Sequence, residues 1–489
     1  LPGMRARAQQ VIDMLEGYYQ GRQVLDNSAF LQPGQDKYTA SMSFVADKIA
    51  TALLHHRPFV IGALGSSVTA GHDNCNYDSY ERQLTRLLTP VFSGTNTTLE
   101  VRNAGQGGGC GDDFKNQPFC VQHMVGDDID IVHYSWTYFE NGPDLEQYRE
   151  QLLRWALLLP KQPAMHVVNV GFLPTVEQCG MQFGPASFFD QYAKYGANVV
   201  CLQTGLLMSG KWGGKKWGEV GDGFHNTTRY GELDGVSPQR KDSLGVVFRN
   251  WHPGPLGFQV VADTFGYTYA KAVVMALDKL EAAQAAITAA GGATGRDRLD
   301  ALWPKVLPRL SKRSLPPPLY CDPAVCSLNN PPGCHNFELP VFGKPQLHIV
   351  PTDHPANPIK NSTGGEWVYW KAGPSPLIPP EEAGMAECGH LDHCGAVKPP
   401  SNTNAGWITF SLPPTMSVGR MFVCCCCSKT CVKETFLDTQ ADFMFDGKLL
   451  DPSKFKEYPN GKCMEVQEKF TGPLVNAHGQ LFLSVKING

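Results

Sequence analysis

The sequence lacks long hydrophobic runs and any strong excess of charge of one sign. No stretch approaches the roughly 20 consecutive apolar residues that a membrane-spanning helix needs, so we expect no membrane span. The 42 Lys and Arg residues nearly balance the 46 Asp and Glu residues, which leaves a formal net charge of −4. This balance argues against a nucleic-acid-binding surface and against a polybasic patch for membrane lipids. It suits a neutral ligand such as a carbohydrate, although charge alone does not select one.

The sequence also lacks an initial methionine and a visible signal peptide, since it begins with Leu1. We therefore expect the numbering to start after processing or trimming. The chain has sixteen cysteines, an even number that a reducing cytosol seldom sustains. Three glycosylation sequons, at Asn96, Asn226 and Asn361, fit passage through a secretory pathway. These features predict a secreted or lumenal glycoprotein.

Most cysteines lie in the second half of the chain: Cys321, Cys326, Cys334, Cys388, Cys394, Cys424, Cys425, Cys426, Cys427, Cys431 and Cys463. The run 424–427 and the segment Glu387–Cys394 contain residue types that bind zinc, but without two pairs at regular spacing. In a strand, consecutive cysteines alternate between the two faces. We therefore favour disulfides with separate partners over a metal site. A bridge between Cys110 and Cys120 could hold the loop between them.

Hydrophobic periodicity divides the chain into four parts. Residues 1–57 are predicted to be mostly helical, with Val11, Met14, Leu15 and Tyr18 on one apolar face. Residues 58–290 alternate apolar strand-like runs with amphipathic helical segments, which predicts βαβ units and a parallel sheet covered on both sides. The predicted strands are 58–65, 99–103, 129–135, 165–171 and 198–202, and a last long helix is predicted for 254–290.

The remaining two parts are a connector and a β-rich unit. Residues 291–345 contain a glycine-rich break and the proline-rich segment Ser314–Leu319, which cannot continue a helix. Cys321, Cys326 and Cys334 could pin this connector. Residues 346–489 contain short strand candidates at 407–412, 420–423, 442–445 and 480–485. They predict a disulfide-rich β-sandwich domain.

Four polar or glycine-rich segments follow predicted strands or precede the last helix. They are Gly65–Gly71, Asn103–Gly109, Thr137–Asn141 and Trp251–Gly257. Each alone has a simple structural explanation, because serine caps helices, glycine permits tight turns and a histidine before a helix is commonly exposed. Together they supply a hydroxyl nucleophile, close backbone donors, an amide and an imidazole base, which acyl transfer requires.

In this order the segments resemble the sequence blocks of the SGNH (GDSL-like) hydrolase superfamily, over residues 58–285. The resemblance implies a flavodoxin-like three-layer sandwich, with Ser67 as nucleophile and Ser66 in the usual Asp position. It also implies Gly108, with Gly107 as a close rival in register, and Asn141 as oxyanion donors. The block His252-Pro-Gly-Pro-Leu-Gly resembles the one that carries the family's catalytic histidine.

The chain departs from the family pattern where an acid should orient that histidine. The position three residues before His252 holds Arg249 in place of the usual Asp. Asp242, a backbone carbonyl or no group at all could take that role. Asp222 and His225 have the family's Asp-x-x-His spacing and form an alternative acid and base pair. His252 is preferred because it directly precedes the long helix that closes the domain.

Together with the cysteine content, the sequons and the attached β-rich part, the resemblance predicts a secreted serine esterase that removes acetyl or other small acyl groups from a glycan or a small ester, without a cofactor or metal. An impaired SGNH domain that binds a glycan or an extracellular matrix partner is the first alternative. An acyltransferase at the same site is the second. Aromatic residues of the β-rich part could line a sugar-binding surface or fill its core: Trp367, Tyr369, Trp370 and Trp407.

Overall fold

The fold is taken from a computed structural model of the chain. It describes residues 1–19, 22, 25–26, 36–65, 67–71, 79–105, 121–135, 145–169, 192, 199–203, 248–249, 252–253, 255–289, 315–321, 323–326, 348–349, 368–371, 395–398, 406–412, 421–424, 441–457, 463–466 and 481–487. None of the helices in these ranges is long and apolar enough to cross a membrane.

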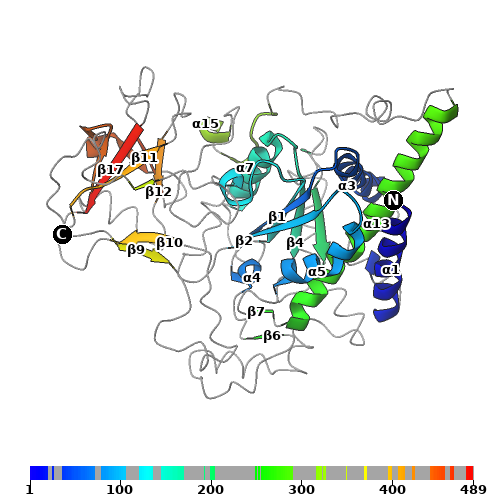
Figure 1. The fold of residues 1–489 in the computed structure, drawn as a ribbon. Helices are drawn as coiled ribbons and strands as arrows, with labels where there is room; N and C mark the ends of the chain where they lie inside the picture. Colours follow the sequence, from blue (N-terminus) through cyan, green and yellow to red (C-terminus); the bar gives the residue numbers. More distant parts are fainter. Residues whose placement is uncertain are drawn as a thin grey trace, which may run out of the picture.

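Five parallel strands form the central sheet of the first half of the chain (Figure 1). In spatial order they are β2 (Leu99–Gly105), β1 (Phe59–Gly65), β3 (Ile131–Ser135), β4 (Ala164–Asn169) and β5 (Val199–Gln203). All residues of β1 are buried, as a continuous apolar run predicts for a strand covered on both faces. The order 2-1-3-4-5 is the flavodoxin-like arrangement. It confirms the predicted α/β class, and each predicted strand is present.

Helices cover both faces of this sheet and produce three layers. On one face, the strands share a core with α1 (Pro2–Tyr18), α3 (Asp36–Leu54), α5 (Tyr80–Phe92) and α13 (Pro255–Ala289). On the other face, they pack with α6 (Val121–Val125) and α7 (Leu145–Leu158). The long helix α13, predicted for 254–290, contacts α1, α3 and α5. All its residues from 260 to 270 are buried, which explains why its apolar residues surround the helix instead of forming one stripe.

The predicted apolar face of α1 is wrong in part. The helix buries Met4, Ala8, Ile12 and Leu15, whereas Met14 is 52% exposed and Tyr18 39% exposed. The buried residues follow the spacing of one helical stripe, and α13 lies against α1. The sequence of α1 has two overlapping apolar stripes, and packing against α13 decides which of them is buried. The packing also gives α1 and α3 a common core with the sheet.

Antiparallel sheets form the C-terminal part. The largest consists of β14 (Lys448–Leu449), β13 (Ala441–Phe445), β17 (Leu481–Ile487), β11 (Ile408–Leu412) and β8 (His348–Ile349). A second contains β12 (Met421–Cys424), β16 (Cys463–Val466) and β15 (Phe455–Glu457), which follows the short helix η6 (Pro452–Lys454). The third pairs β9 (Val368–Lys371) with β10 (Gly395–Lys398). The four strands predicted from the sequence are all present.

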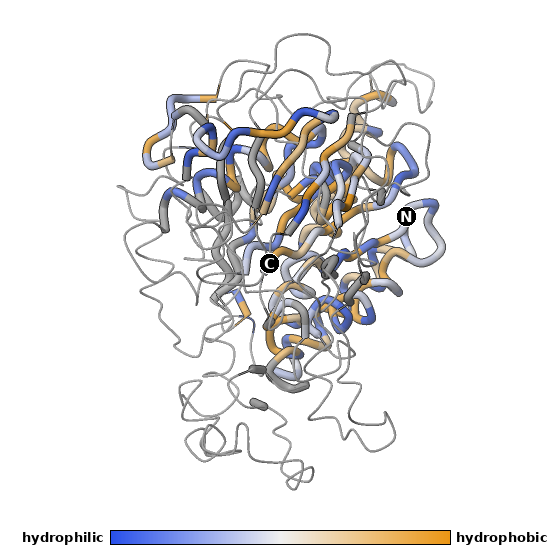
Figure 2. Tube along the Cα trace, turned by 90° about the vertical axis from the view of Figure 1, so that its left-hand side faces the viewer, coloured by the Kyte–Doolittle hydropathy of each residue, from blue (hydrophilic) through white to orange (hydrophobic). Residues whose placement is uncertain are grey.

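Local sequence explains the strands of the largest sheet. Buried and half-buried residues alternate along β13. Figure 2 shows hydrophobic and hydrophilic stretches following one another along the described chain. Asp446 and Gly447 join β13 to β14 with positive φ angles of 46° and 83°, the geometry of a tight hairpin turn with an Asp-Gly sequence. The disulfide-rich sandwich and the domain boundaries remain predictions. Trp407 is partly buried, which fits either of its two proposed roles.

Candidate functional site

The carboxyl edge of the parallel sheet carries the predicted nucleophile segment. Ser67 is the first residue of the short helix α4 (Ser67–Ala70), which begins two residues after β1 ends at Gly65. The helix is followed by Gly71, whose φ angle of 79° reverses the chain. In open α/β sheets, ligands bind outside this edge of the strands. Ser67 therefore lies in the segment that directly follows β1, at the edge of the sheet where a ligand site is expected.

The segment of the predicted base lies beside this helix. His252 begins β7 (His252–Pro253), which forms a small antiparallel pair with β6 (Phe248–Arg249) just before α13 starts. The backbone of β7 is in contact with α4, and Figure 1 places both elements with the start of α13 below the sheet. Two segments separated by more than 180 residues are therefore neighbours. Arg249 lies opposite His252 in the register of this pair.

Several predicted residues lie outside the part of the chain that the structure describes: Ser66, Gly107, Gly108, Cys110, Cys120, Asn141, Asp222, His225 and Asp242. The strands that lead to two of them are described. The segment with Gly108 continues from the end of β2 at Gly105, and the segment with Asn141 continues from the end of β3 at Ser135. Both strands are direct neighbours of β1. The segments with Ser67, Gly108 and Asn141 therefore follow three neighbouring strands, β1, β2 and β3.

Side-chain hydrogen bonds connect these three strand ends. Asn103 Nδ2 donates to the carbonyl oxygen of Thr69 at 2.6 Å, while Asn103 Oδ1 accepts from the backbone N–H of Gly105 at 2.8 Å. The hydroxyls of Thr69 and Ser135 are hydrogen-bonded to each other. Thr69, Asn103 and Ser135 carry one signal in the sequence, a position within or directly before the predicted blocks.

A buried acid lies behind this group. Glu81, in the first turn of α5, is 2% exposed, and its Oε2 is 3.2 Å from Asn103 Nδ2. Burial raises the pKa of Glu81 to about 8, because removal from water disfavours the charged form. The carboxyl group is therefore mostly protonated at neutral pH. Sequence reasoning missed Glu81, since a charged residue in an amphipathic helix is normally expected on the solvent side.

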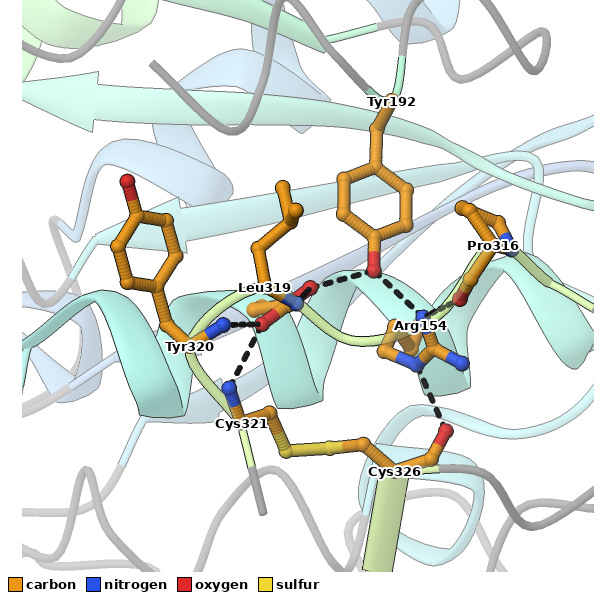
Figure 3. The surroundings of a disulfide bond; sticks show 8 residues. Arg154, Tyr192, Pro316, Leu319, Tyr320, Cys321 and Cys326 are labelled. Atoms are coloured by element: carbon orange, nitrogen blue, oxygen red, sulfur yellow. Dashed lines mark hydrogen bonds between the residues drawn. A yellow bond between two sulfur atoms is a disulfide. The ribbon is translucent and has the colours of Figure 1, made fainter. Parts of the chain in front are cut away.

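The connector is fastened to α7 by a second buried group (Figure 3). Both carboxylate oxygens of Glu150 accept backbone N–H groups of Leu319, Tyr320 and Cys321 at 2.7–2.8 Å. Arg154, one turn further along α7, donates to the carbonyls of Pro316 and Cys326. Tyr192 joins the two charged groups, since its hydroxyl donates to Glu150 and accepts from Arg154 at 2.6 Å each.

A disulfide closes the same segment of the connector. Cys321 and Cys326, at the end of α15 (Pro323–Cys326), are bridged and buried, as expected for two of the three cysteines proposed to pin this region. Cys334 lies outside the described residues. Cys424 and Cys463 are register partners of β12 and β16. In the part of the chain covered by the structure, no group of three or more His, Cys, Asp or Glu residues could hold a metal ion.

At this edge, α4 begins with a serine and β7 begins with a histidine, and the catalytic roles of Ser67 and His252 stay predictions. No protein-family model and no curated protein matches the sequence. Two solved structures are similar in part, both of a two-domain esterase (CEX) active on acetylated mannans. The one co-crystallised with mannopentaose has 11% identity and a TM-score of 0.36, covering 91% of this chain and 89% of that chain. The other has 12% identity and a TM-score of 0.36, covering 95% and 93%.

Proposed function

We propose that this protein is a secreted serine esterase of the SGNH type, which removes acetyl or other small acyl groups from a glycan. The observation that carries the proposal is the contact between α4, which begins with Ser67, and β7, which begins with His252. This contact lies at the carboxyl edge of a parallel sheet in the order 2-1-3-4-5. Nucleophile and base must come from segments that meet in space, and these two segments are far apart in sequence.

In the proposed reaction, Ser67 Oγ attacks the ester carbonyl carbon while His252 accepts the hydroxyl proton. The backbone N–H of Ser67, the N–H of Gly108 and the side chain of Asn141 stabilise the oxyanion. The C–O bond to the alcohol breaks, and the alcohol leaves with the proton from His252. Water then attacks the acyl-enzyme with His252 as base, which releases the carboxylic acid and restores Ser67.

The choice of a glycan ester rests on the near-neutral charge of the chain and on the β-rich part that follows the parallel sheet in the sequence. Secretion is proposed from the cysteine content and the sequons. The same site would serve an acyltransferase if a sugar hydroxyl replaced water in the second step. Arg249, which lies opposite His252 where the family has an acid, favours a second candidate, a glycan-binding domain with an impaired site.

Labelling with a fluorophosphonate serine probe, followed by intact mass, tests the proposal. We expect one adduct on the wild type and on Ser66→Ala, a neighbouring-serine control, and no adduct on Ser67→Ala. Loss of labelling in His252→Ala with retention in His225→Ala would identify the base. A folded wild-type protein that takes up no probe would contradict the esterase function and favour the glycan-binding candidate. Acetate release from an acetylated oligosaccharide, with and without an acceptor sugar, then separates hydrolysis from transfer.

A further inference from the structure

A continuous set of hydrogen bonds joins the ends of three neighbouring strands. Asn103, near the end of β2, bonds both the Thr69 carbonyl in α4 and the N–H of Gly105. Thr69 bonds in turn through its hydroxyl to Ser135, the last residue of β3. The set therefore links the nucleophile turn to the starts of the segments that lead to Gly108 and Asn141. Each of the three predicted site loops has one member of this set at its base.

The burial of these groups makes the set difficult to replace. Thr69 and Ser135 are 0% exposed. If one hydroxyl is removed, a water molecule can replace it only where the buried site leaves a cavity large enough to hold the water. The carboxamide of Asn103 uses both of its polar atoms, one as donor and one as acceptor. A carboxylate can only accept, and an aliphatic side chain can do neither. The chemistry of the position therefore requires an amide.

The space around Thr69 is equally restricted. A Cβ atom added at Gly65 would overlap Thr69 Oγ1 and lie 2.5 Å from Ser135 Oγ. The two hydroxyls consequently lie directly against the backbone of β1, with no room for a side chain between them. β1 leads directly into α4, which begins with Ser67. The hydrogen bonds of Thr69, Asn103 and Ser135 therefore fix α4 relative to β1, β2 and β3.

We propose that Thr69, Asn103 and Ser135 are positioning residues, which hold the nucleophile turn in register with the two segments that supply the oxyanion donors. This inference rests on the proposed function and extends it to residues that do not contact the substrate. Displacements of about 1 Å within an active site cost about 10²-fold in rate, and oxyanion donors act only at their correct distance. Loss of one bond in the set is therefore expected to reduce the rate of acyl transfer more than substrate binding.

The β-rich part of the chain offers a matched control. Thr409 in β11 and Ser484 in β17 are also buried, and their hydroxyl oxygens are 2.8 Å apart. Thr409→Val removes the same type of buried hydroxyl pair as Thr69→Val, but in a different sheet. Any general cost of losing such a pair should affect both variants, whereas an effect of positioning should affect only Thr69→Val.

The experiment measures kcat and KM for a chromogenic acetate ester and the second-order rate of fluorophosphonate labelling. The variants are Thr69→Val, Thr69→Ser, Asn103→Asp and Thr409→Val, each checked for folding by circular dichroism. We expect Thr69→Val and Asn103→Asp to lose about 10- to 100-fold in kcat and in labelling rate, with KM within about threefold. Thr69→Ser, which keeps the hydroxyl, should recover most of the rate, and Thr409→Val should match the wild type.

Two outcomes would overturn the inference, and they differ from failure of the proposed function. Folded Thr69→Val and Asn103→Asp proteins that react at the wild-type rate would show that the set does not position the site. So would a Thr69→Ser protein as slow as Thr69→Val, because packing of the methyl group would then be responsible. A wild-type protein that neither labels nor hydrolyses the ester would instead remove the proposed function and this inference together. If a variant does not fold, the other two site variants still decide between these results.

Discussion

The hydroxyl of Tyr269 lies 2.7 Å from Nδ1 of His166 in the core between α13 and the parallel sheet. The same hydroxyl is 2.7 Å from Nε2 of His133, and all three residues are essentially inaccessible to solvent. Burial lowers the pKa of both imidazoles, that of His166 to about 3, so both are neutral. A single hydroxyl proton can serve only one imidazole, and the other imidazole must donate its ring N–H to the hydroxyl oxygen.

Tyr269→Phe should destabilise the protein by about 1–3 kcal/mol, because two buried imidazole nitrogens would lose their shared partner. The phenyl ring keeps the stacking against His133 and Phe265, so the change isolates the hydroxyl. Urea unfolding at pH 7 measures the effect. An unfolding free energy within about 0.3 kcal/mol of the wild type would mean that the network contributes nothing.

Glu81 should make stability depend on pH. The folded state keeps its proton up to a pKa of about 8, whereas an ordinary glutamate in the unfolded chain releases it near 4.5. Between these values the unfolded state binds fewer protons, so stability falls as pH rises, by up to about 1.4 kcal/mol per pH unit. Below and above this window Glu81 contributes no slope.

Glu81→Gln should flatten this dependence, since the amide is neutral at every pH in the window. Thermal unfolding between pH 5 and pH 9 tests the expectation, and the variant should gain most over the wild type at pH 9. Glu281→Gln is the control, because Glu281 is an exposed partner of Arg5 and should leave the slope unchanged. Equal slopes in the wild type and Glu81→Gln would show that Glu81 is ionised in the folded protein.

Glu150→Ala should detach the connector from α7. The change leaves three backbone N–H groups and the hydroxyl of Tyr192 without their shared acceptor, and each buried donor left without a partner costs about 1–3 kcal/mol. Limited proteolysis should therefore cut near residues 315–321 faster than in the wild type, and the midpoint of denaturant unfolding should fall. Glu281→Ala, which removes a largely exposed ion pair with Arg5, should cost less than about 1 kcal/mol. Equal proteolysis of both variants would contradict the role of Glu150 as an anchor.

Gly65→Ala should reduce activity more than its effect on stability explains. The added methyl group would displace the hydroxyls of Thr69 and Ser135, at a cost of about 1–3 kcal/mol in stability. Gly62→Ala, on the same strand, would place its Cβ 2.6 Å from Val125 Cβ instead, away from the site. Both variants should lose comparable stability, but only Gly65→Ala should lose about 10-fold or more in labelling rate. Equal losses of activity would indicate general strain in β1.

Local patterns were sufficient for the strands and for the long helix. The apolar run that ends at Gly65 predicts β1 because a short apolar run ended by glycine is typical of a strand buried on both faces, and the Asp446-Gly447 hairpin likewise has a local cause. The same patterns predicted a face of α1 that is wrong in part, since Leu15 belongs to either stripe while Met14 and Ile12 belong to different ones. Contact with α13 decides between them.

The sequence by itself determined which elements form and which residue types follow each strand, because periodicity and turn chemistry act over a few residues. The resemblance of two of its segments to the SGNH blocks predicted Ser67 as nucleophile and His252 as base. Only the tertiary structure brought α4 into contact with β7 and joined Thr69 to Ser135. It alone also placed Glu81 beside Asn103, away from water. Such relationships join residues far apart in the chain, and their energies depend on burial and distance, which local sequence does not encode.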